Sequence, residues 1–586
     1  MNVFHHPAPP EAPHHRFWPA GVPRALDVPD ESLWQALERR AEAEPQAVGL
    51  DFLGRRWTWQ ALHDEAERLA GALLALGVGA GDRVIVFMQN CPQFLLGYHA
   101  VLRANAVVVP VNPMNKADEL DHYIQDSGAR VALASSDIAG ELARAQEMLQ
   151  GEGGARLEHL VVFDLAEALP DDIEAAQAGW PLHWRRWLPT RHPKPTLAGG
   201  SVHAWTDLVA RGLRPGPLST QGQDLAALPY TSGTTGAAKG CMHNHASLMH
   251  NAMTSQDWLD LRPGDVMLIV VPMFHITGMV MAMLAGIRLG ASIVLLPRWD
   301  RDVAAAAIEQ QRVTHWPNIP TMVIDLLGKP DLQPAMLRSL RYIGGGGAAM
   351  PEAIATRLKN ELGLDYIEGY GLTETSGPTH SNPPGAVRRQ CLGIPYLSTR
   401  ARVVDPDTLH DVATGEVGEI LVHGPQVFQG YWRNPDATRA AFVELDGLRW
   451  FRTGDLGRVD ADGYHTMADR LKRMINASGF KVWPAEVEAL LYRHPGVQEV
   501  CIIATRDDYR GESVKAVIVP KPEARETLTE ADVIAWSREH MAVYKVPRQV
   551  EFVEQLPKSA SGKLLWRLLQ VEQDQRDART ESTPPA

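Results

Sequence analysis

Cysteine, positive charge and long apolar runs are all scarce in this sequence, and each shortage argues against a class of protein. The four cysteines, Cys91, Cys241, Cys391 and Cys501, are scattered without metal-ligand spacing, which indicates reduced thiols in a cytoplasmic protein. The net charge of −13 argues against a broad nucleic-acid surface, so we expect no nucleic-acid partner. Residues 1–31 contain no apolar signal-peptide core and are expected to form a flexible tail.

One apolar run, Val266–Ile287, is long enough to span a bilayer and contains no Asp, Glu, Lys or Arg. Pro272, His275 and Thr277 interrupt it, and the valine-rich stretch before Pro272 is typical of a buried strand. We therefore predict a strand, a turn and a buried helix, and no transmembrane span. The sequence leaves peripheral membrane contact and the oligomeric state undecided.

The chain is too long for one ordinary domain and has the composition of a globular protein. A helix is expected from Ser32, followed by a hairpin over residues 48–59. Short valine-rich runs at residues 82–90, 106–113 and 130–135 then alternate with helical segments. That alternation predicts a large α/β domain whose mostly parallel sheet is covered by helices on both faces.

Residues 150–224 break this pattern, because they are rich in Pro, Trp, Arg and Gly and only weakly periodic. We interpret them as an insertion with surface connections. The character changes again at Asp469, where a charged stretch precedes a small α+β domain of about a hundred residues, the size of an independent unit. The expected parts are a tail (1–31), a large domain (32–468), a small C-terminal domain (469–570) and a disordered polar tail (571–586).

The stretch Tyr230–Gly240 has the composition of a phosphate-binding loop. Glycines let a backbone wrap closely around an anion, hydroxyl and N–H groups donate to its oxygens, and a lysine supplies positive charge. The spacing is not that of a Walker loop, because the lysine is followed by Gly240 rather than by Ser or Thr. A solvated connector is the alternative for such a composition. The candidate phosphate-binding residues are Thr231, Ser232, Gly233, Thr234, Thr235, Gly236 and Lys239.

Two other stretches follow predicted strands, at the place where α/β folds carry their sites. His275 ends the first strand of the apolar run, although a lone histidine is more often structural. Gly344–Gly347 end another strand and precede Ala348 and Ala349. Their bare backbone would let a flat ring lie against it, with a tight turn as the alternative reading.

Two later motifs carry groups suited to a nucleotide. In Glu368–Thr375, Tyr370 can stack on a base, Thr373 can donate to a phosphate, and Glu374 can hold Mg²⁺ beside that phosphate. Farther on, Asp455 follows a Thr-Gly pair and can accept both hydroxyls of a ribose. A turn aspartate is the alternative for Asp455.

All these motifs, in this order, resemble those of the adenylate-forming superfamily, which includes acyl-CoA synthetases, luciferases and peptide-synthetase adenylation domains. The resemblance covers about Ser32 to Leu569 and ends in a glycine-and-serine loop, Pro557–Lys563. That last motif departs from the family pattern in one position, where Ser559 replaces a threonine.

The resemblance implies a role for each matched residue. Thr373 would contact the α-phosphate of ATP, Glu374 would bind Mg²⁺, and the hydroxyl-rich loop with Lys239 would hold the other phosphates. Lys563 would bridge the substrate carboxylate to the α-phosphate, and His275 would border the acid. Gly347, Ala348, Ala349 and Tyr370 would contact the adenine, Asp455 the ribose, and Arg470 the nucleotide. Lys472 would be the hinge about which the small domain rotates, and coenzyme A would pass near Gly479.

The resemblance therefore implies an ATP-dependent acyl-CoA synthetase. Its substrates would be a carboxylic acid, ATP and coenzyme A (CoA), with Mg²⁺ as cofactor. The apolar segments Met273–Met283 and Trp316–Val323 suggest a medium- or long-chain fatty acid, with a 4-coumarate-like aromatic acid second. A luciferase-type enzyme or a stand-alone acyl-AMP ligase is the rival reading. A non-catalytic nucleotide-binding protein is the third, and it would be expected to lack Lys563 or Glu374, both of which are present.

Overall fold

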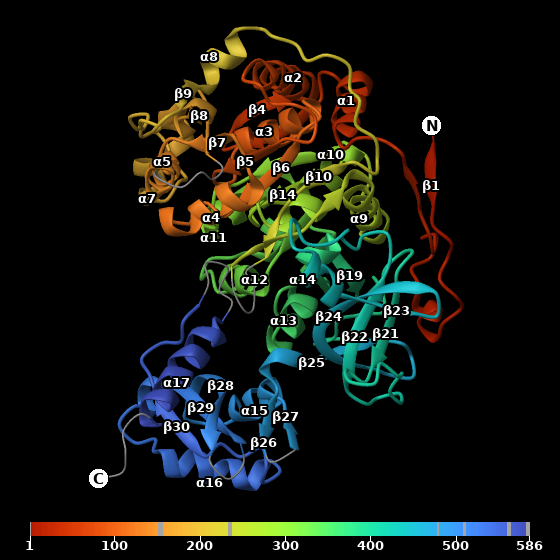
Figure 1. Cartoon of the computed structure of the whole chain (residues 1–586), viewed down its shortest axis with the longest axis vertical. Helices are drawn as coiled ribbons and strands as arrows, with labels where there is room; N and C mark the ends of the chain where they lie inside the picture. The colour runs from red at the N-terminus through yellow and green to blue at the C-terminus, as the bar shows by residue number, and fades with distance from the viewer. Residues whose placement is uncertain are drawn as a thin grey trace. The chain divides into compact units, whose positions relative to one another are not determined.

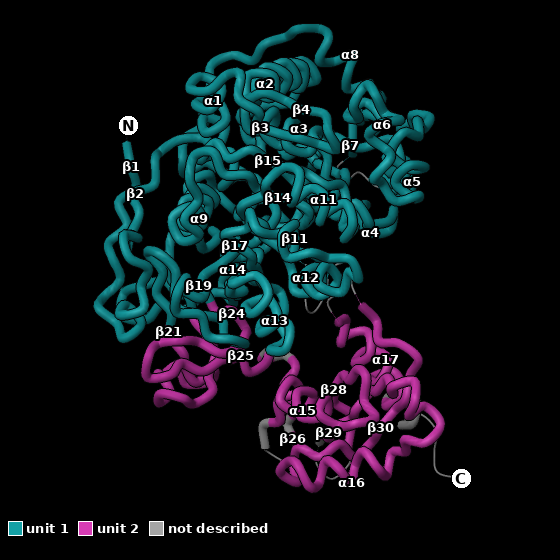
Figure 2. The backbone as a smooth tube through the Cα atoms, turned by 180° about the vertical axis from the view of Figure 1, so that it is seen from behind, with its two compact units in different colours: residues 1–401, 422–451 teal, residues 402–421, 452–586 magenta. Residues whose placement is uncertain are grey.

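The protein divides into two compact units in the computed structural model, which describes residues 2–149, 156–231, 237–477, 480–507, 511–558 and 564–581 (Figure 1). The first unit comprises residues 1–401 and 422–451, and the second comprises residues 402–421 and 452–586 (Figure 2). The second unit thus contains the predicted C-terminal domain together with residues 402–421 and 452–468.

A seven-stranded sheet in the first unit has the strand order β13-β10-β6-β5-β7-β8-β9. All neighbouring strands in this sheet run parallel except β13, which is antiparallel to β10 at one edge. Continuous valine-rich runs suit such a sheet, because strands covered on both faces need apolar residues at every position. The strands are β5 (Arg83–Phe87), β6 (Val107–Val111), β7 (Val131–Ser135), β8 (His159–Phe163), β9 (Ser201–Ala204), β10 (Leu225–Ala227) and β13 (His243–Asn244).

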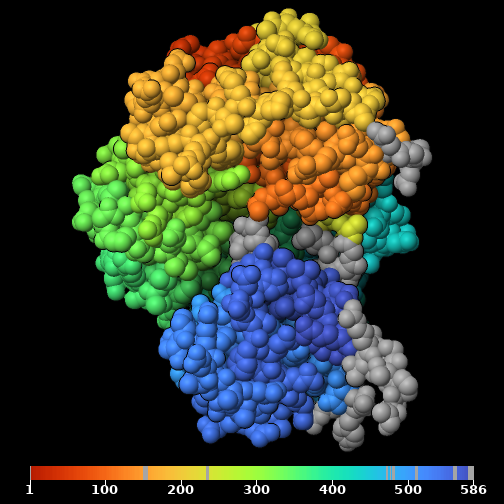
Figure 3. Space-filling view, turned by 90° about the vertical axis from the view of Figure 1, so that its left-hand side faces the viewer, coloured from red at the N-terminus to blue at the C-terminus, as the bar shows by residue number. Residues whose placement is uncertain are grey.

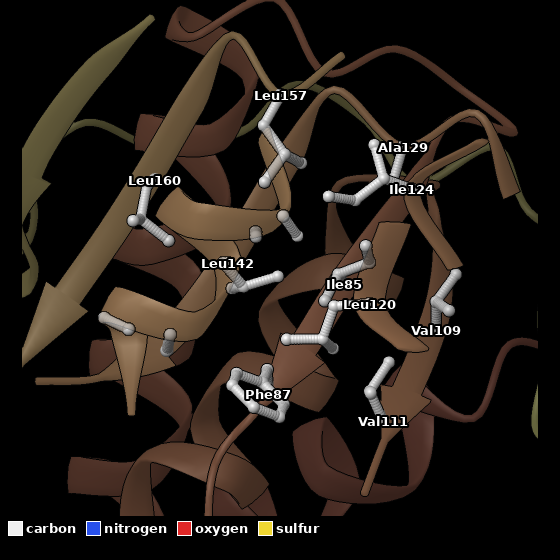
Figure 4. Close-up of a cluster of buried hydrophobic side chains, with 14 of the residues drawn as sticks. Ile85, Phe87, Val109, Val111, Leu120, Ile124, Ala129, Leu142, Leu157 and Leu160 are labelled. Carbon is white, nitrogen blue, oxygen red and sulfur yellow. The ribbon is translucent and has the colours of Figure 1, made fainter. Parts of the chain in front are cut away.

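Helices cover both faces of this sheet. On one face, Ile85 and Phe87 of β5 meet Leu120 of α4 (Ala117–Ser127) and Leu142 of α5 (Ala139–Met148), as Figure 4 shows. The alternate residues of β5 point to the other face and are equally buried. There α3 (Pro92–Arg103) packs on β5 and β6, and α2 (Trp59–Ala75) packs on α3.

The interpretation of residues 150–224 as an insertion was wrong for two segments. Strands β8 and β9 extend the seven-stranded sheet, and α8 (Trp205–Ala210) packs against them. Trp184 of α7 (Leu182–Trp187) and Trp205 are almost completely buried. The run Leu160–Phe163 in β8 is apolar throughout, as the other parallel strands are, but the Pro-, Trp-, Arg- and Gly-rich composition around it suggested a loop. The connection between β8 and β9 forms part of the surface of this unit (orange to yellow in Figure 3).

A nine-stranded sheet completes the first unit, with the order β20-β19-β18-β17-β16-β14-β15-β3-β4. The strands from β18 to β3 are parallel to one another, β4 is antiparallel to β3, and β19 is antiparallel to both of its neighbours, β18 and β20. The predicted hairpin at residues 48–59 is the β3–β4 pair. The strands are β3 (Val48–Phe52), β4 (Arg55–Thr58), β14 (Val266–Ile269), β15 (Ser292–Leu295), β16 (His315–Asn318), β17 (Tyr342–Gly345), β18 (Tyr366–Leu372), β19 (Gly377–Ser381) and β20 (Ile394–Pro395).

The apolar run Val266–Ile287 forms a strand, a turn and a buried helix, as predicted. β14 leads into a π-helix, Thr277–Leu284, which continues as α10 (Ala285–Leu289). In the described part of the chain, no helix combines the length and the apolarity needed to cross a bilayer. The other helices of this region are α1 (Trp34–Ala43), α9 (His245–Trp258), α11 (Arg301–Gln311), α12 (Pro320–Leu327) and α13 (Glu352–Leu362).

The second unit contains a five-stranded sheet with the order β27-β26-β29-β28, to which β30 adds beside β29. Its elements are β26 (Ile475–Ala477), β27 (Phe480–Val482), α15 (Pro484–Leu491), β28 (Val497–Asp507), β29 (Gly511–Pro520), α16 (Glu530–His540), β30 (Gln549–Phe552) and α17 (Trp566–Glu581). A further sheet consists of β21 (Arg400–Val404), β22 (Gly418–His423), β23 (Phe442–Leu445), β24 (Leu448–Val459) and β25 (His465–Arg470). The predicted fold class, a large α/β domain with mostly parallel sheets and a small α+β domain, is confirmed.

The two predicted tails contain defined structure. Near the N-terminus, β1 (Val3–His5) pairs with β2 (Asp27–Pro29), and the Trp18 ring packs edge-on against Trp258 at 5.0 Å. At the other end, α17 runs to Glu581, and its buried Gln573 donates to Thr505 Oγ1 at 3.1 Å. The expectation of a flexible and a disordered tail was therefore wrong for these segments. Polar composition could not reveal the buried partners that these side chains find.

Helix α9 is buried although its sequence is polar. It packs against the π-helix, α10 and β13, and His245, His250, Asn251 and Thr254 are each at most 1% exposed. Burial lowers the pKa of His245 and of His250 to about 3, so both imidazoles are neutral in the native state.

Replacing His250 by Gln should reduce the acid sensitivity of the fold. A histidine with a native pKa of about 3 binds protons mainly in the unfolded state. Its contribution to the unfolding free energy is therefore complete above the unfolded pKa of about 6.5 and falls as the pH drops toward 3. Between pH 7.5 and pH 5, the variant should lose about 2 kcal/mol less unfolding free energy than the wild type. Urea unfolding followed by tryptophan fluorescence at the two pH values measures this difference.

The same substitution at the exposed His183 of α7 is the matched control and should leave the pH dependence as in the wild type. A His250→Gln variant with the wild-type pH dependence would contradict the assignment of a buried neutral imidazole.

Candidate active site

The loop after β18 carries Thr373 and Glu374 and is held by a buried histidine. Thr373–Thr375 form a single 3₁₀ turn. His243 donates from Nε2 to the carbonyl oxygen of Thr373 at 2.7 Å. Burial lowers the pKa of His243 to about 4, so the imidazole is neutral and serves as a fixed donor to the loop.

Asn251 of α9 fixes the rest of this loop. Its Nδ2 lies 3.1 Å from each of three carbonyl oxygens, those of Thr375, Ser376 and Pro378. Ser376 has a φ of 48°, in the left-handed region that a serine adopts only at a cost of about 1–3 kcal/mol. The amide hydrogen bonds help to hold this strained turn in place.

A tyrosine joins Glu374 to the predicted phosphate lysine. The hydroxyl of Tyr431 donates to Glu374 Oε1 at 2.8 Å. The ammonium of Lys239 lies 4.1 Å from the centre of the same tyrosine ring, a cation–π contact. Glu374 and Lys239, two predicted site residues far apart in sequence, therefore both contact the side chain of Tyr431, which was not among the predicted residues.

The predicted phosphate loop begins and ends in a short antiparallel pair, β11 (Tyr230–Thr231) with β12 (Lys239–Gly240). Two side chains of α4 anchor its ends. His122 donates from Nε2 to the Ala238 carbonyl oxygen at 2.6 Å, and the Tyr230 hydroxyl donates to Asp126 Oδ2 at 2.6 Å. Five predicted ligands lie outside the described residues: Ser232, Gly233, Thr234, Thr235 and Gly236.

A pocket in the first unit brings His275 and Thr373 together. Its lining is mostly apolar or aromatic: Pro110, Asn112, Tyr123, Pro229, Tyr230, Phe274, His275, Ile276 and Thr373. The apolar segments that suggested a fatty acid contribute less than expected. Phe274 and Ile276 line the pocket, but Met279 and Trp316 are fully buried in the core.

The glycine run forms the end of β17 and the turn that follows. A Cβ atom on Gly345 would lie 1.9 Å from the Asn318 carbonyl oxygen, and one on Gly346 would lie 2.3 Å from that of Gly369. These glycines are therefore required by close strand packing. Gly347 differs, because its φ of 87° requires glycine while the space around it is open. Gly347, Ala348 and Ala349 are exposed, and Tyr370 is buried.

The remaining predicted residues belong to the second unit. Asp455 of β24 is 1% exposed and lies opposite Arg470 of β25 in the strand register. Lys472 lies in the 3₁₀ turn Leu471–Arg473 that follows β25. Gly479 and Lys563 lie outside the described residues, so the roles assigned to them stay predictions.

Glu374 fits a magnesium ion that also contacts a substrate phosphate. Within the described ranges, no group of three or more His, Cys, Asp or Glu side chains could hold a metal by itself. Mg²⁺ is commonly bound by only one or two carboxylates plus phosphate oxygens and waters. A single carboxylate with one oxygen oriented by Tyr431 therefore matches that kind of site.

Comparison with known proteins identifies the family. The AMP-binding enzyme family matches residues 37–432, and the AMP-binding enzyme C-terminal domain matches residues 486–563. The chain belongs to the AMP-binding enzyme family.

Relatives in the AMP-binding family are named for different acids. The chain is 34% identical to a long-chain-fatty-acid–CoA ligase of Bacillus subtilis (strain 168), over 95% of this chain and 97% of that protein. It is also 34% identical to a feruloyl-CoA synthase of Amycolatopsis sp, over 90% and 96% respectively. The solved structure of ATP-bound MatB from Rhodopseudomonas palustris has a TM-score of 0.76 and 28% identity, with 93% of this chain and 99% of that chain covered.

Three residues of this AMP-binding enzyme were missed by the sequence analysis: His243, Asn251 and Tyr431. His243 and Asn251 lie in a polar stretch without motif spacing, and their role depends on carbonyl groups more than a hundred residues away. Tyr431 follows a glycine, Gly430, and that local sequence does not show its contact with Glu374, which lies 57 residues earlier.

Replacing Asn251 by Ala should loosen the loop that carries Thr373 and Glu374. Three buried carbonyl groups would lose their donor, which costs about 1–3 kcal/mol of unfolding free energy. Amide hydrogen exchange over residues 373–378 should become faster than in the wild type. Asn360→Ala, at an exposed position of α13, is the control and should change neither quantity. Equal exchange rates in the two variants would show that Asn251 does not hold the loop.

Proposed function

We propose that the protein is an ATP-dependent acid–CoA ligase that activates a hydrophobic carboxylic acid as an acyl-adenylate and transfers the acyl group to CoA. The observation that carries this proposal is the pocket in which Thr373 lies together with His275 and the aromatic residues Tyr123 and Phe274. The Thr373 hydroxyl, which can bind a phosphate, and apolar side chains, which can bind a hydrophobic acid, thus line the same pocket. The named acid–CoA ligases among its relatives support the same reaction class.

In the first step, a carboxylate oxygen of the acid attacks the α-phosphorus of ATP, and the bond to the departing pyrophosphate breaks. Thr373 donates to the α-phosphate, Lys239 neutralises charge on the departing phosphates, and Lys563 bridges the two reacting groups. Glu374, oriented by Tyr431, would hold Mg²⁺, which supplies charge neutralisation at the phosphates. Catalysis consists of positioning and electrostatic stabilisation, without a covalent bond to the protein.

The other predicted residues hold the nucleoside and serve the second step. The exposed turn at Gly347–Ala349 and Tyr370 flank the adenine, while Asp455 and Arg470 bind the ribose side. The C-terminal domain then turns about Lys472, and the CoA thiolate, approaching past Gly479, attacks the acyl carbon and releases AMP. A site rebuilt between two steps accounts for a catalytic lysine on a domain with its own hinge.

The acid that we favour is a medium- or long-chain fatty acid, with a 4-coumarate-like aromatic acid as the second candidate. The apolar and aromatic side chains of the pocket support a hydrophobic acid of either kind. The relatives include a fatty-acid ligase and a feruloyl-CoA synthase at equal identity, so identity does not separate the two.

A panel of acids assayed by AMP release with and without CoA tests the proposal. Within the fatty acids, kcat/KM should rise about fourfold per added CH₂ until the pocket is full, because each buried CH₂ contributes about 0.8 kcal/mol. Faster turnover of acetate or an amino acid than of every fatty or aromatic acid would overturn the hydrophobic assignment. Adenylate that accumulates without thioester formation in the presence of CoA would instead identify a stand-alone acyl-AMP ligase.

Two substitutions should separate the half-reactions. Lys563→Ala should abolish adenylate formation, because a charge contact with the reacting phosphate in a closed site is worth several kcal/mol, and it should still convert supplied acyl-AMP to thioester. Gly479→Leu should form adenylate but fail to convert it, because the new side chain would obstruct the thiol. Single-turnover kinetics of adenylate formation and of thioester formation, measured in each variant, tests this separation. Loss of both steps in both variants would favour one fixed site over a rotating domain.

A further inference from the structure

A short segment, Phe428–Trp432, joins the two parts of the site that carry opposite charge. The Phe428 backbone N–H donates to the Glu374 carbonyl oxygen at 2.8 Å. Four residues later, the Trp432 N–H donates to the Gly240 carbonyl oxygen, also at 2.8 Å. The segment is therefore bonded at one end to the loop of Glu374 and at the other to the end of the phosphate loop.

Tyr431 belongs to this segment and repeats the connection through its side chain. Its hydroxyl donates to Glu374 Oε1 at 2.8 Å, and its ring face receives the Lys239 ammonium at 4.1 Å from the ring centre. The residue is 8% exposed, and the Phe428 ring packs edge-on against it at 4.8 Å. The ring is thus held by packing, so it can fix the position of both charged groups.

The chemistry of the tyrosine suits both contacts. A phenol is protonated at neutral pH, so its hydroxyl can donate to the Glu374 carboxylate. A neutral ring also keeps the negative π-face that attracts an ammonium group, and partial burial strengthens this attraction. The Tyr431 side chain therefore orients the Glu374 carboxylate through its hydroxyl group and the Lys239 ammonium through its ring face.

We propose that Tyr431 is a positioning residue that sets the carboxylate of Glu374 for Mg²⁺ and the ammonium of Lys239 for the pyrophosphate part of ATP. The inference rests on the proposed function and adds to it a residue that acts on the nucleotide through two others. Its two contacts can be removed separately, since phenylalanine retains the ring and leucine retains neither the ring nor the hydroxyl.

Equilibrium binding of ATP in the absence of acid tests the hydroxyl contact. Isothermal titration calorimetry of the full chain at a series of Mg²⁺ concentrations gives the Mg²⁺ concentration for half-maximal ATP affinity. Tyr431→Phe should raise this concentration about tenfold, because a hydrogen bond to a charged group is lost. At saturating Mg²⁺ the ATP affinity should return to that of the wild type.

Binding of inorganic pyrophosphate without Mg²⁺ tests the ring contact. Tyr431→Leu should weaken this binding about fivefold, because Lys239 loses the ring face, whereas Tyr431→Phe should bind as the wild type does. Phe442→Leu is the matched control, since Phe442 belongs to the same aromatic cluster and packs on Phe428. It should leave both the Mg²⁺ dependence and the pyrophosphate affinity unchanged.

The possible results distinguish this inference from the proposed function. A wild-type chain that binds no ATP at any Mg²⁺ concentration would overturn both. Mg²⁺-dependent ATP binding that is the same in the wild type and in Tyr431→Phe would overturn the positioning role alone. The positioning role would also be overturned if Phe442→Leu changed the Mg²⁺ dependence or the pyrophosphate affinity as much as the Tyr431 variants do. General loss of packing in the aromatic cluster would then be the cause. If Tyr431→Leu fails to fold, the Mg²⁺ titration of the conservative Tyr431→Phe variant decides by itself.

Discussion

The candidate site depends on one constraint: the backbone between β18 and β19 leaves the strand ladder inside the protein, where its carbonyl groups need donors. A buried carbonyl without a hydrogen bond is costly, and those of Thr375, Ser376 and Pro378 are buried. His243 and Asn251 supply the missing donors from one direction, and Phe428 supplies another to Glu374. The positions of Thr373 and Glu374 follow from these bonds, since neither side chain could be fixed on a loop that was free to relax.

This arrangement also explains why the buried helix α9 carries an asparagine at position 251. A leucine at that position would pack well but would leave the carbonyl groups of Thr375, Ser376 and Pro378 without this donor. The histidines of α9 and of the preceding β13 are neutral, because burial lowers the pKa of each well below its usual value. They therefore place no fixed positive charge in the interior, and His243 in its neutral form still donates to the Thr373 carbonyl oxygen.

Sequence predicted the parts of this structure that local patterns encode. Alternating valine-rich runs and helical segments identified the α/β sheets. The strand before His275 was found because a parallel strand is apolar throughout, but β14 ends at Ile269, so the prediction that His275 ends the strand was wrong. Strand β8 was missed although it has the same continuous apolar run as β5 to β7, because the surrounding composition suggested a loop, whereas β9 has no such run. The motif residues Thr373 and Glu374 could be selected as candidates, because a hydroxyl and a carboxylate show their possible chemistry in the sequence itself. Tyr431 could not, because its role exists only through groups that folding brings to it.

The two sides of the site differ in what they are made of. Apart from Tyr370, the face assigned to adenine is a turn of small residues, Gly347–Ala349. It directly follows Gly345 and Gly346, which lie so close to neighbouring strands that no side chain can be added there. The wall assigned to the acid consists of replaceable side chains such as Phe274 and Ile276. Point mutation can thus reshape one wall without disturbing the other. An evolving lineage with this scaffold would keep its nucleotide while changing its acid, and an engineer seeking a new acid would have freedom on that wall alone.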